Sequence, residues 1–298
     1  MSAPSLVAML PLKISGAHYD DNIERLRLLI DSLDAFLRLP FRLQVHAVCV
    51  PSEITRARAA FGPGTRSHFT RTDLRFISEE SLVPGIGAHK AIGWFKQQAL
   101  KLAFVAASPT AFCLTLDPDV VLCRDLFEDD LLYAGRCTTS WMAKSDHPAW
   151  WDASVRVLGM ATDAEAPGLN VTPQMLARPI AAALAGHLRQ RLGGGNPWRG
   201  LLAVEAAWTE YTLYSVFAEA SGLLDRYHRP GVPGGRRLLG RSVWVPANIE
   251  NYSLAAIHDD PDGGLFSVCA SHTHVPVADL RAMFAELLRH AGKQPEMA

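Results

Sequence analysis

The chain has 298 residues, of which 49% are hydrophobic and 20% are charged, and its 29 basic and 30 acidic residues leave a formal net charge of −1. This composition excludes a disordered or fibrous chain, and the balanced charge argues against a protein that coats nucleic acid, so we expect no nucleic-acid partner. The length is sufficient for one large or two small domains with a hydrophobic core.

The first third of the chain alternates apolar runs, which predict strands, with segments whose apolar residues recur at helical spacing. Strands are predicted over residues 6–14, 43–50, 74–77 and 111–116, and helices over residues 21–37, 52–61 and 91–107. Asp21 and Glu24 form a capping-box pattern at the start of the first helix. This order predicts βαβ units and a mostly parallel sheet, with a ligand site outside the carboxyl ends of its strands.

Beyond residue 125 the pattern is richer in helices and less regular. Helices are predicted over residues 173–192, 201–222 and 277–290, and a further strand over residues 266–270. Residues 229–241 combine four glycines, two prolines and four arginines, a composition typical of a mobile loop. We find no internal repeat.

Cysteine usage and the longest apolar run bear on localisation. The five cysteines are spread widely, lie mostly in apolar runs and show no C-x-x-C spacing, so we expect buried thiols in a reducing compartment. The longest charge-free run, residues 102–116, has 15 residues, fewer than the roughly 20 that a membrane span needs. The first basic residue is Lys13, which is atypical of a signal peptide. We predict a cytoplasmic protein and leave open a peripheral contact with the inner face of the membrane.

Two carboxylates, Asp117 and Asp119, come directly after the fourth predicted strand, with Pro118 between them. On extended backbone, residues i and i+2 point to the same side, so both carboxylates would face one site. Like charges this close repel each other unless a cation lies between them, and hard oxygen ligands suit Mn²⁺ or Mg²⁺ that also holds substrate phosphates. The alternative is a solvated acidic turn at the end of a strand.

Two enzyme classes place Asp-x-Asp after such a strand. In haloacid-dehalogenase-like phosphatases that strand opens the domain, whereas here 116 residues precede Asp117. In glycosyltransferases of the A-type fold the pair follows a nucleotide-binding half and binds the metal of a nucleotide-diphosphate sugar. The position in this chain fits the second class.

Four motifs occur in an order that marks a known family: Gly93–Leu102 (GWFKQQALKL), Asp117–Asp119 (DPD), Gly168–Gln174 (GLNVTPQ) and Thr209–Tyr214 (TEYTLY). On these motifs the chain resembles a bacterial family of glycosyltransferase-like proteins long catalogued as a domain of unknown function. The resemblance covers most of the chain. It implies an A-type glycosyltransferase fold and transfer of a sugar onto a bacterial surface polysaccharide or a lipid-linked saccharide, without specifying donor or acceptor.

The first motif places Trp94, Gln97, Gln98 and Lys101 at positions i, i+3, i+4 and i+7, so they share one face of the predicted helix. Amides and an ammonium group suit sugar hydroxyls or diphosphate oxygens. The alternative is a partly solvated face with Trp94 as a core anchor, and the resemblance favours the site.

The third motif contains Thr172-Pro173, which is typical of a helix N-cap followed by proline at the first helical position. A helix start binds anions, and Asn170, Thr172 and Gln174 add polar groups that orient a sugar or a phosphate. The alternative is a well-capped helix that binds no ligand.

The fourth motif begins with Glu210 and Tyr211 in an otherwise apolar helix. A buried glutamate is costly unless it is paired or used, so Glu210 is the leading candidate for acid/base catalysis or for contact with an acceptor hydroxyl. A salt bridge from Glu210 to a local arginine is the alternative.

The last predicted strand leads into Ser271–His274, where alternation would place His272 and His274 on one side. By analogy with several A-type glycosyltransferases, His272 or His274 would be a further metal ligand, and a structural histidine is the alternative. The arginines of residues 229–241 form either a lid over the diphosphate or a solvated loop.

We therefore predict an α/β protein of the A-type glycosyltransferase class, with a Rossmann-like mixed sheet flanked by helices and a helix-rich C-terminal half. A single domain is expected over residues 1–298, with a nucleotide-binding half (1–124) and an acceptor-side half (125–298). The predicted reaction is transfer of a sugar from a nucleotide-diphosphate donor to a saccharide or lipid-linked acceptor. Asp117, Asp119 and His272 would hold Mn²⁺ or Mg²⁺, and Glu210 and Lys101 would be catalytic. The remaining candidates would bind donor or acceptor: Lys13, Trp94, Gln97, Gln98, Asn170, Thr172, Gln174 and Tyr211.

Two rival functions remain. A sugar-phosphate nucleotidyltransferase uses a related fold, but it carries a glycine-rich basic signature after the first strand that residues 12–16 lack. A non-catalytic saccharide-binding protein would use Trp94, Trp150, Trp151 and Trp198 as stacking platforms. The intact pair of Asp117 and Asp119 counts against that second rival.

Overall fold

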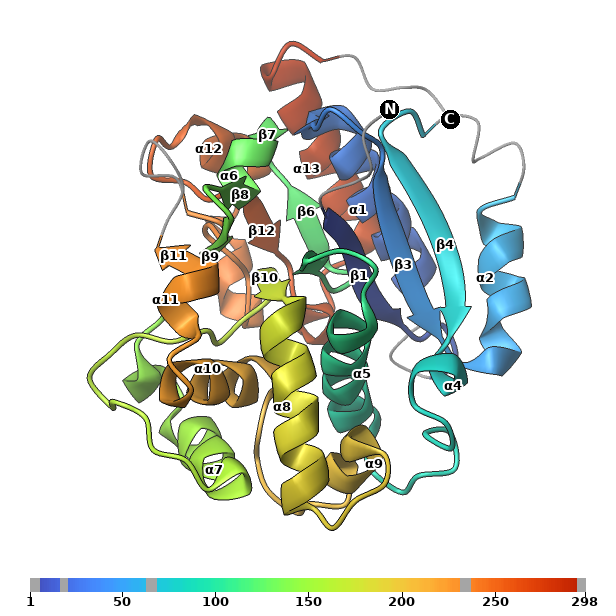
Figure 1. The fold of residues 1–298 in the computed structure, drawn as a ribbon. Helices are drawn as coiled ribbons and strands as arrows, with labels where there is room; N and C mark the ends of the chain where they lie inside the picture. The colour runs from blue at the N-terminus through green and yellow to red at the C-terminus, as the bar shows by residue number, and fades with distance from the viewer. Residues whose placement is uncertain (1–5, 17–20, 63–68, 231–236, 294–298) are drawn as a thin grey trace.

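A five-stranded sheet lies at the centre of the protein, seen here in a computed structural model that describes residues 6–16, 21–62, 69–230 and 237–293 (Figure 1). Its strands are β1 (Leu6–Leu12), β3 (Leu43–Cys49), β4 (Thr72–Ser78), β5 (Phe112–Thr115) and β10 (Gln174–Ala177). They lie in the order β10-β5-β1-β3-β4, and only β10 runs antiparallel to its neighbour. The predicted α/β class with a mostly parallel sheet is confirmed, and its four parallel strands are those that the apolar runs predicted.

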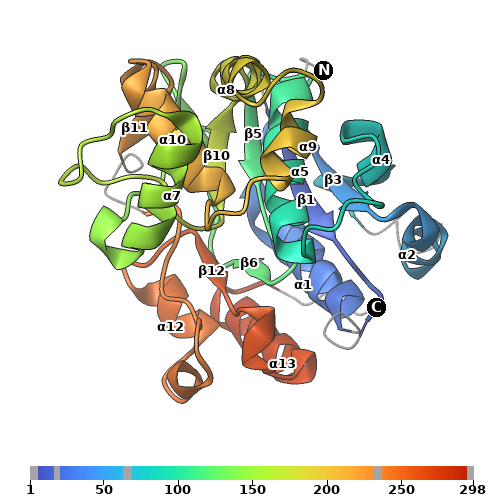
Figure 2. The same ribbon diagram turned by 90° about the horizontal axis from the view of Figure 1, so that it is seen from below.

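Helices cover both faces of this sheet, as the view from below shows (Figure 2). On one side lie α1 (Asn22–Phe36) and α13 (Val277–His290), and on the other lies α5 (Gly93–Ala107). A sheet buried on both faces requires strands that are apolar on both sides, and all seven residues of β1 are buried. The short α2 (Ile54–Ala60), preceded by η1 (Pro51–Glu53), connects β3 to β4, and α4 (Glu79–Leu82) follows β4.

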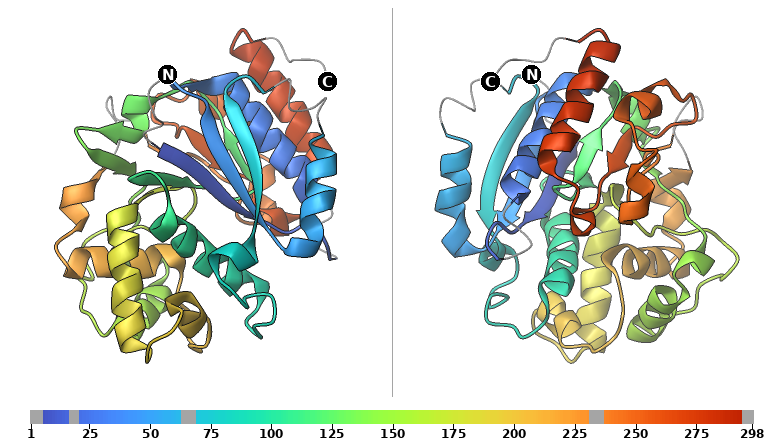
Figure 3. Two further views of the ribbon diagram at one scale, coloured as in Figure 1. Left: turned by 45° about the vertical axis from the view of Figure 1, so that its right-hand side comes forward. Right: turned by 180° about the vertical axis from the view of Figure 1, so that it is seen from behind.

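The second half contains more helices and only short strands. Its helices are α6 (Glu128–Leu131), α7 (Pro148–Leu158), α8 (Arg178–Arg191), α9 (Pro197–Leu202), α10 (Glu210–Ala220), α11 (Leu224–Tyr227) and α12 (Leu254–Asp259). Three small sheets join the short strands: β2 (Leu37–Arg38) with β7 (Leu126–Phe127), β6 (Val120–Leu122) with β12 (Phe266–Val268), and β8 (Leu132–Tyr133) with β9 (Arg136–Thr139) and β11 (His228–Pro230). In Figure 3 the yellow α8 lies beside the teal α5, so the two halves meet along these helices.

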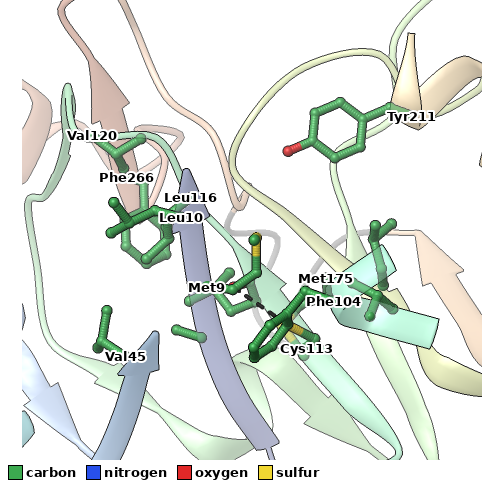
Figure 4. Packing of buried hydrophobic residues seen from close by; sticks show 14 of the residues in the cluster. Met9, Leu10, Val45, Phe104, Cys113, Leu116, Val120, Met175, Tyr211 and Phe266 are labelled. Atoms are coloured by element: carbon green, nitrogen blue, oxygen red, sulfur yellow. Dashed lines mark hydrogen bonds between the residues drawn. The ribbon is translucent and has the colours of Figure 1, made fainter. Parts of the chain in front are cut away.

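Buried hydrophobic side chains from both halves form one cluster. Figure 4 shows part of it, with Met9 of β1 near Phe104 of α5, Cys113 of β5 and Met175 of β10, and with Leu10 on the opposite face of β1 near Val120 and Phe266. All five cysteines are free and buried, as the sequence predicted. Burial raises the pKa of Cys49 to about 12, so its thiol stays protonated at neutral pH.

The prediction of a helix from Pro173 is wrong. The Thr172–Pro173 peptide bond is cis, and residues Gln174–Ala177 form β10, which pairs with β5. The helix α8 begins only at Arg178, with Pro179 in its first turn. Four consecutive buried residues next to an unpaired strand edge gain more from backbone hydrogen bonds to β5 than from a helical turn, which the helix-like pattern of the sequence could not show.

The predicted helix over residues 201–222 is in fact two helices, α9 and α10, separated by residues 203–209. The side chain of Thr209 accepts a hydrogen bond from the backbone N–H of Thr212, which starts α10 anew. The capping box at Asp21 and Glu24 is also wrong, because α1 has no side-chain cap and the Asp21 carboxylate pairs with Arg25 instead.

Two further features complete the fold. Part of the arginine-rich segment, residues 231–236, lies outside the described residues, while Arg229 belongs to β11 and donates to the carbonyl oxygen of Asp129. Within the described ranges, no helix combines the length and the apolar character needed to cross a membrane.

Candidate active site

A pocket of about 480 Å³ opens at the carboxyl ends of β1 and β5. These neighbours mark the point where the chain order of the sheet reverses, since β3 and β4 lie on one side of β1 and β5 lies on the other. Ligands of open α/β sheets bind at such a point. The pocket draws on both halves of the chain, from Pro11 and Asn22 to Ser271 and His272.

Asp117 and Asp119 both line this pocket, although not on extended backbone as predicted. Residues 117–120 form a turn in which the N–H of Val120 donates to the carbonyl oxygen of Asp117, because Pro118 fixes the φ angle that such a turn needs. One carboxylate oxygen of Asp119 accepts a hydrogen bond from the N–H of Ser271 at 2.8 Å. The C-terminal segment therefore holds Asp119 in place.

Lys101 forms ion pairs with both Asp117, a predicted metal ligand, and Glu210, the other catalytic candidate. Its Nζ lies 2.9 Å from Oδ1 of Asp117 and 2.9 Å from Oε1 of Glu210, and its side chain is buried. Burial alone would lower the pKa of Lys101, but the two carboxylates outweigh it and raise the pKa well above the usual range. Glu210 thus forms the ion pair expected as the alternative, but with a lysine from the other half of the chain rather than with a local arginine.

The charges around the pocket do not balance. Among its described lining residues, the carboxylates of Asp117, Asp119 and Glu210 face one ammonium group, that of Lys101, and no arginine. Burial, together with the charge of Asp117, raises the pKa of Asp119 to about 6. Burial also raises the pKa of Glu210 against the opposing effect of Lys101. The side chains that line the pocket thus carry two negative charges in excess when their carboxylates are ionised, and Arg25, which lies outside the lining, offsets part of the effect on Asp119.

The prediction that four side chains share one face of α5 is confirmed, because all four line the pocket: Trp94, Gln97, Gln98 and Lys101. Gln98 is buried, and its Oε1 accepts a hydrogen bond from the backbone N–H of Glu210 at 2.9 Å. That bond fixes the orientation of the amide, and its Nε2 has no partner among the described residues. The amide of Gln98 therefore both caps α10 and leaves a donor for a ligand.

Asn170 and Thr172 line the same pocket and are almost fully buried. Both amide atoms of Asn170 and the hydroxyl of Thr172 have no hydrogen-bond partner in the part of the chain that the structure describes. Gly168 sets the path of this segment, since a Cβ at that position would lie only 2.2 Å from the ring of Trp151. Buried polar groups without partners are costly, so these atoms indicate a polar ligand or bound water.

Of the three remaining candidates, Gln174 and Lys13 do not line the pocket and Tyr211 does. Both amide atoms of Gln174 bond to the backbone of Ser140, so this amide is not available to a ligand. Lys13 is not among the residues that line the pocket. The hydroxyl of Tyr211 lies 3.0 Å from Oγ1 of Thr115 and 3.4 Å from Nζ of Lys101. Tyr211 therefore helps to hold Lys101 in its ion pairs with Asp117 and Glu210.

The histidines do not alternate along a strand as predicted, because Ser271–Thr273 form a short 3-10 helix and His274 adopts a left-handed conformation. Only His272 lines the pocket. Its Nε2 lies 2.8 Å from the carbonyl oxygen of Trp244. A carbonyl can only accept, so Nε2 carries the proton and, in the neutral ring, Nδ1 is the nitrogen with a free lone pair.

The donor set fits a hard divalent cation in part. Within the described ranges, no three His, Cys, Asp or Glu side chains lie close enough together to hold a metal by themselves. Mg²⁺ and Mn²⁺ are commonly bound by one or two carboxylates together with substrate phosphates, and Asp117 and Asp119 supply two such carboxylates. The excess of two negative charges matches the charge of one divalent ion.

Sequence reasoning missed several lining residues, including Asn22, Thr209, Trp244 and Ser271. Asn22 follows a loop at the end of β1 and donates through Nδ2 to the carbonyl oxygen of Lys13. The Thr209 cap could have been found from the Thr at the start of the fourth motif. Trp244 carries no local signal, because it reaches the pocket only through the pairing of residue 243 with residue 269.

Comparisons with known proteins identify a family and a similar solved structure. The family model described as "Family of unknown function (DUF6492)" matches residues 3–291. No curated protein matches the chain. Among solved structures, the chain is similar to the crystal structure of mouse xyloside xylosyltransferase 1 in its apo form, with 14% identity and a TM-score of 0.47 over 91% of this chain and 99% of that chain.

Proposed function

The chain belongs to the family of unknown function DUF6492, and we propose that it is a metal-dependent glycosyltransferase. It would transfer a sugar from a nucleotide-diphosphate donor to a saccharide or lipid-linked acceptor. We propose that residues 1–298 act as one unit, since the pocket is built from both halves. The observation that carries the proposal is a pocket at the reversal point of the sheet with two excess negative charges beside unpartnered neutral amides.

Asp117 and Asp119 are the residues that would hold Mn²⁺ or Mg²⁺. Such an ion, when bound, supplies positive charge that stabilises a leaving diphosphate. His272 lines the same pocket with its Nε2 proton fixed on the carbonyl oxygen of Trp244, but within the described ranges it does not lie close enough to Asp117 and Asp119 to form a three-residue site. We therefore assign the remaining coordination positions to substrate phosphates. Lys101 keeps the Asp117 carboxylate oriented through contacts to both of its oxygens.

Glu210 is the pocket carboxylate outside the Asp117–Asp119 pair, and we assign it to the acceptor hydroxyl. In the reaction, the acceptor oxygen forms a bond to the anomeric carbon of the sugar, and the bond from that carbon to the diphosphate oxygen breaks. The hydroxyl proton passes to a carboxylate or to the departing diphosphate. Burial raises the pKa of Glu210, which strengthens its ionised form as a proton acceptor.

Gln98, Asn170 and Thr172 are assigned to the sugar. Asn170 leaves both a donor and an acceptor without partners, and a hydroxyl group satisfies both kinds of atom at once. A phosphate oxygen only accepts and would leave Oδ1 of Asn170 unpaired. These residues therefore favour the hydroxyl-bearing part of the donor over its diphosphate.

The test is titration of Mn²⁺ against a panel of nucleotide sugars, with release of nucleoside diphosphate as the readout. We expect metal-dependent release by the wild type and a fall of at least about 100-fold in Asp119→Asn. Asp73→Asn is the matched control. Asp73 lies on β4, its exposed carboxylate forms an ion pair with Arg75, and it does not line the pocket.

Two results would contradict the proposal. One is the absence of metal-dependent nucleotide binding in the wild type, which leaves a non-catalytic saccharide-binding protein. The other is release of pyrophosphate from a nucleoside triphosphate and a sugar phosphate, which indicates a nucleotidyltransferase.

A further inference from the structure

Three tryptophans at the pocket have no role in the proposed reaction. Trp94, Trp150 and Trp244 all line it, and they come from α5, from α7 and from the segment before η4 (Pro246–Ile249). Trp94 is 43% exposed and Trp244 is 37% exposed, and these are the only tryptophans among the large hydrophobic side chains most exposed in the described parts of the chain. Exposed indoles gathered at one pocket indicate a binding surface.

The tryptophans are held in place by their neighbours. The ring of Trp150 stacks on His147 with centroids 4.0 Å apart and planes 16° apart, and it lies 6.2 Å from the ring of Trp94. Trp94 in turn packs edge-on against Phe95. His272 contacts the backbone of Trp244. Rings that are fixed before binding lose little conformational entropy when a ligand stacks on them.

The chemistry of this aromatic rim (Trp94, Trp150 and Trp244) favours a carbohydrate over a membrane. A sugar ring presents C–H groups on its faces, which pack on indole, and hydroxyls on its edges, which suit the amide of Gln97 in the same pocket lining. A surface that binds anionic lipid combines aromatics with several lysines or arginines. The described lining of this pocket contains Lys101 alone, and two carboxylates hold it.

We propose that the aromatic rim is the acceptor subsite and that the acceptor presents a carbohydrate chain, whose terminal sugar stacks on Trp94 and Trp244 with its hydroxyl toward Glu210. This inference rests on the proposed function in one respect, because the bound carbohydrate is an acceptor only if the protein is a glycosyltransferase. The stacking itself is a binding property that does not depend on turnover. It can therefore be measured without a donor.

The experiment is titration of the protein, residues 1–298, with short neutral oligosaccharides of hexoses and N-acetylhexosamines, followed by tryptophan fluorescence. We expect saturable binding in the wild type, weakened about 10-fold in Trp94→Ala and in Trp244→Ala. Phe127→Ala is the matched control, because Phe127 is 50% exposed and does not line the pocket, and its binding should equal that of the wild type.

Asp119→Asn separates this inference from the proposed function. If it loses nucleotide binding and keeps oligosaccharide binding, both proposals stand. If the wild type binds oligosaccharide through the rim but no nucleotide sugar, the rim stands and the proposed reaction fails. The rim is overturned if no oligosaccharide binds at about 10 mM, if the tryptophan variants bind like the wild type, or if the rim instead mediates binding to phosphatidylglycerol vesicles.

Discussion

Two buried polar clusters lie along α10, one turn apart, and they differ in how completely their atoms are paired. Around His228, the imidazole Nε2 bonds to Tyr214 and Nδ1 to Thr139, and Tyr214 also accepts from the N–H of Ala177. In the pocket, Glu210 and Tyr211 share the lining with Asn170, whose amide atoms have no partner among the described residues. The first cluster is complete without a ligand, whereas the second one is not.

This difference separates structural from functional polarity. A buried network whose donors and acceptors are all matched stabilises the fold and leaves nothing for a ligand. A cluster with excess charge and unpaired amides is costly in the free protein and is compensated when a ligand binds. Substitutions in the first cluster should therefore affect stability, and those at unpaired atoms of the second should affect activity.

The largest effect is expected from Lys101→Met, which removes the ammonium that contacts both Asp117 and Glu210. Leaving the buried carboxylate of Glu210 and the partly buried carboxylate of Asp117 without it should lower the free energy of unfolding by about 3–5 kcal/mol, measured by urea denaturation without metal. Adding Glu210→Gln to this variant should recover part of the loss. Wild-type stability in Lys101→Met would show that the pocket charges are not coupled as described.

Acid should destabilise the paired cluster through His228, where burial lowers the pKa from 6.5 to about 3. The unfolded chain binds a proton below about pH 6.5 and the native imidazole does not until about pH 3, so stability falls as the pH falls through this window. At about pH 4 the loss should be about 3 kcal/mol. The measurement is the free energy of unfolding of the wild type and of His228→Gln at neutral and at acid pH, and the variant should lack this part of the decline. An equal decline in the two proteins would contradict the assignment to His228.

Tyr214→Phe removes the hydroxyl that bonds to His228 and to the N–H of Ala177. The expected loss is about 1–3 kcal/mol in the free energy of unfolding, because two buried partners are left unpaired. Tyr133→Phe, at a tyrosine that is 54% exposed, should change stability by less than about 0.5 kcal/mol. Similar losses in the two variants would remove the distinction between paired and solvent-facing hydroxyls.

The smallest effect on stability is expected from Asn170→Ala, because the amide that it removes has no partner. The free energy of unfolding should change by less than about 1 kcal/mol, while release of nucleoside diphosphate falls at least about 10-fold. Gln174→Ala is the matched variant from the same motif, since both of its amide atoms bond to Ser140. It should lose about 1–3 kcal/mol of stability. The reverse pattern would break the comparison between the two clusters.

Much of the first half could be predicted from the sequence. Fully buried parallel strands are short apolar runs, and the 3.6-residue repeat of α5 places Trp94, Gln98 and Lys101 on one face, which the pocket confirms as geometry. Prediction failed where local and long-range preferences conflict. Residues 174–177 have a helix-like context but pair with β5, and Ser271–His274 turn instead of extending.

The sequence by itself determined the mostly parallel sheet, the order of motifs and the position of Asp117 at a strand end, because hydrophobic periodicity and turn residues act over a few neighbours. Only the tertiary structure decided that Lys101 pairs with Glu210 across 109 residues, that Asn170 is unpaired while Gln174 is satisfied, and that Trp244 reaches the pocket. Those outcomes depend on which surfaces pack together, and a buried polar atom acquires a partner, or lacks one, only when the fold has closed around it.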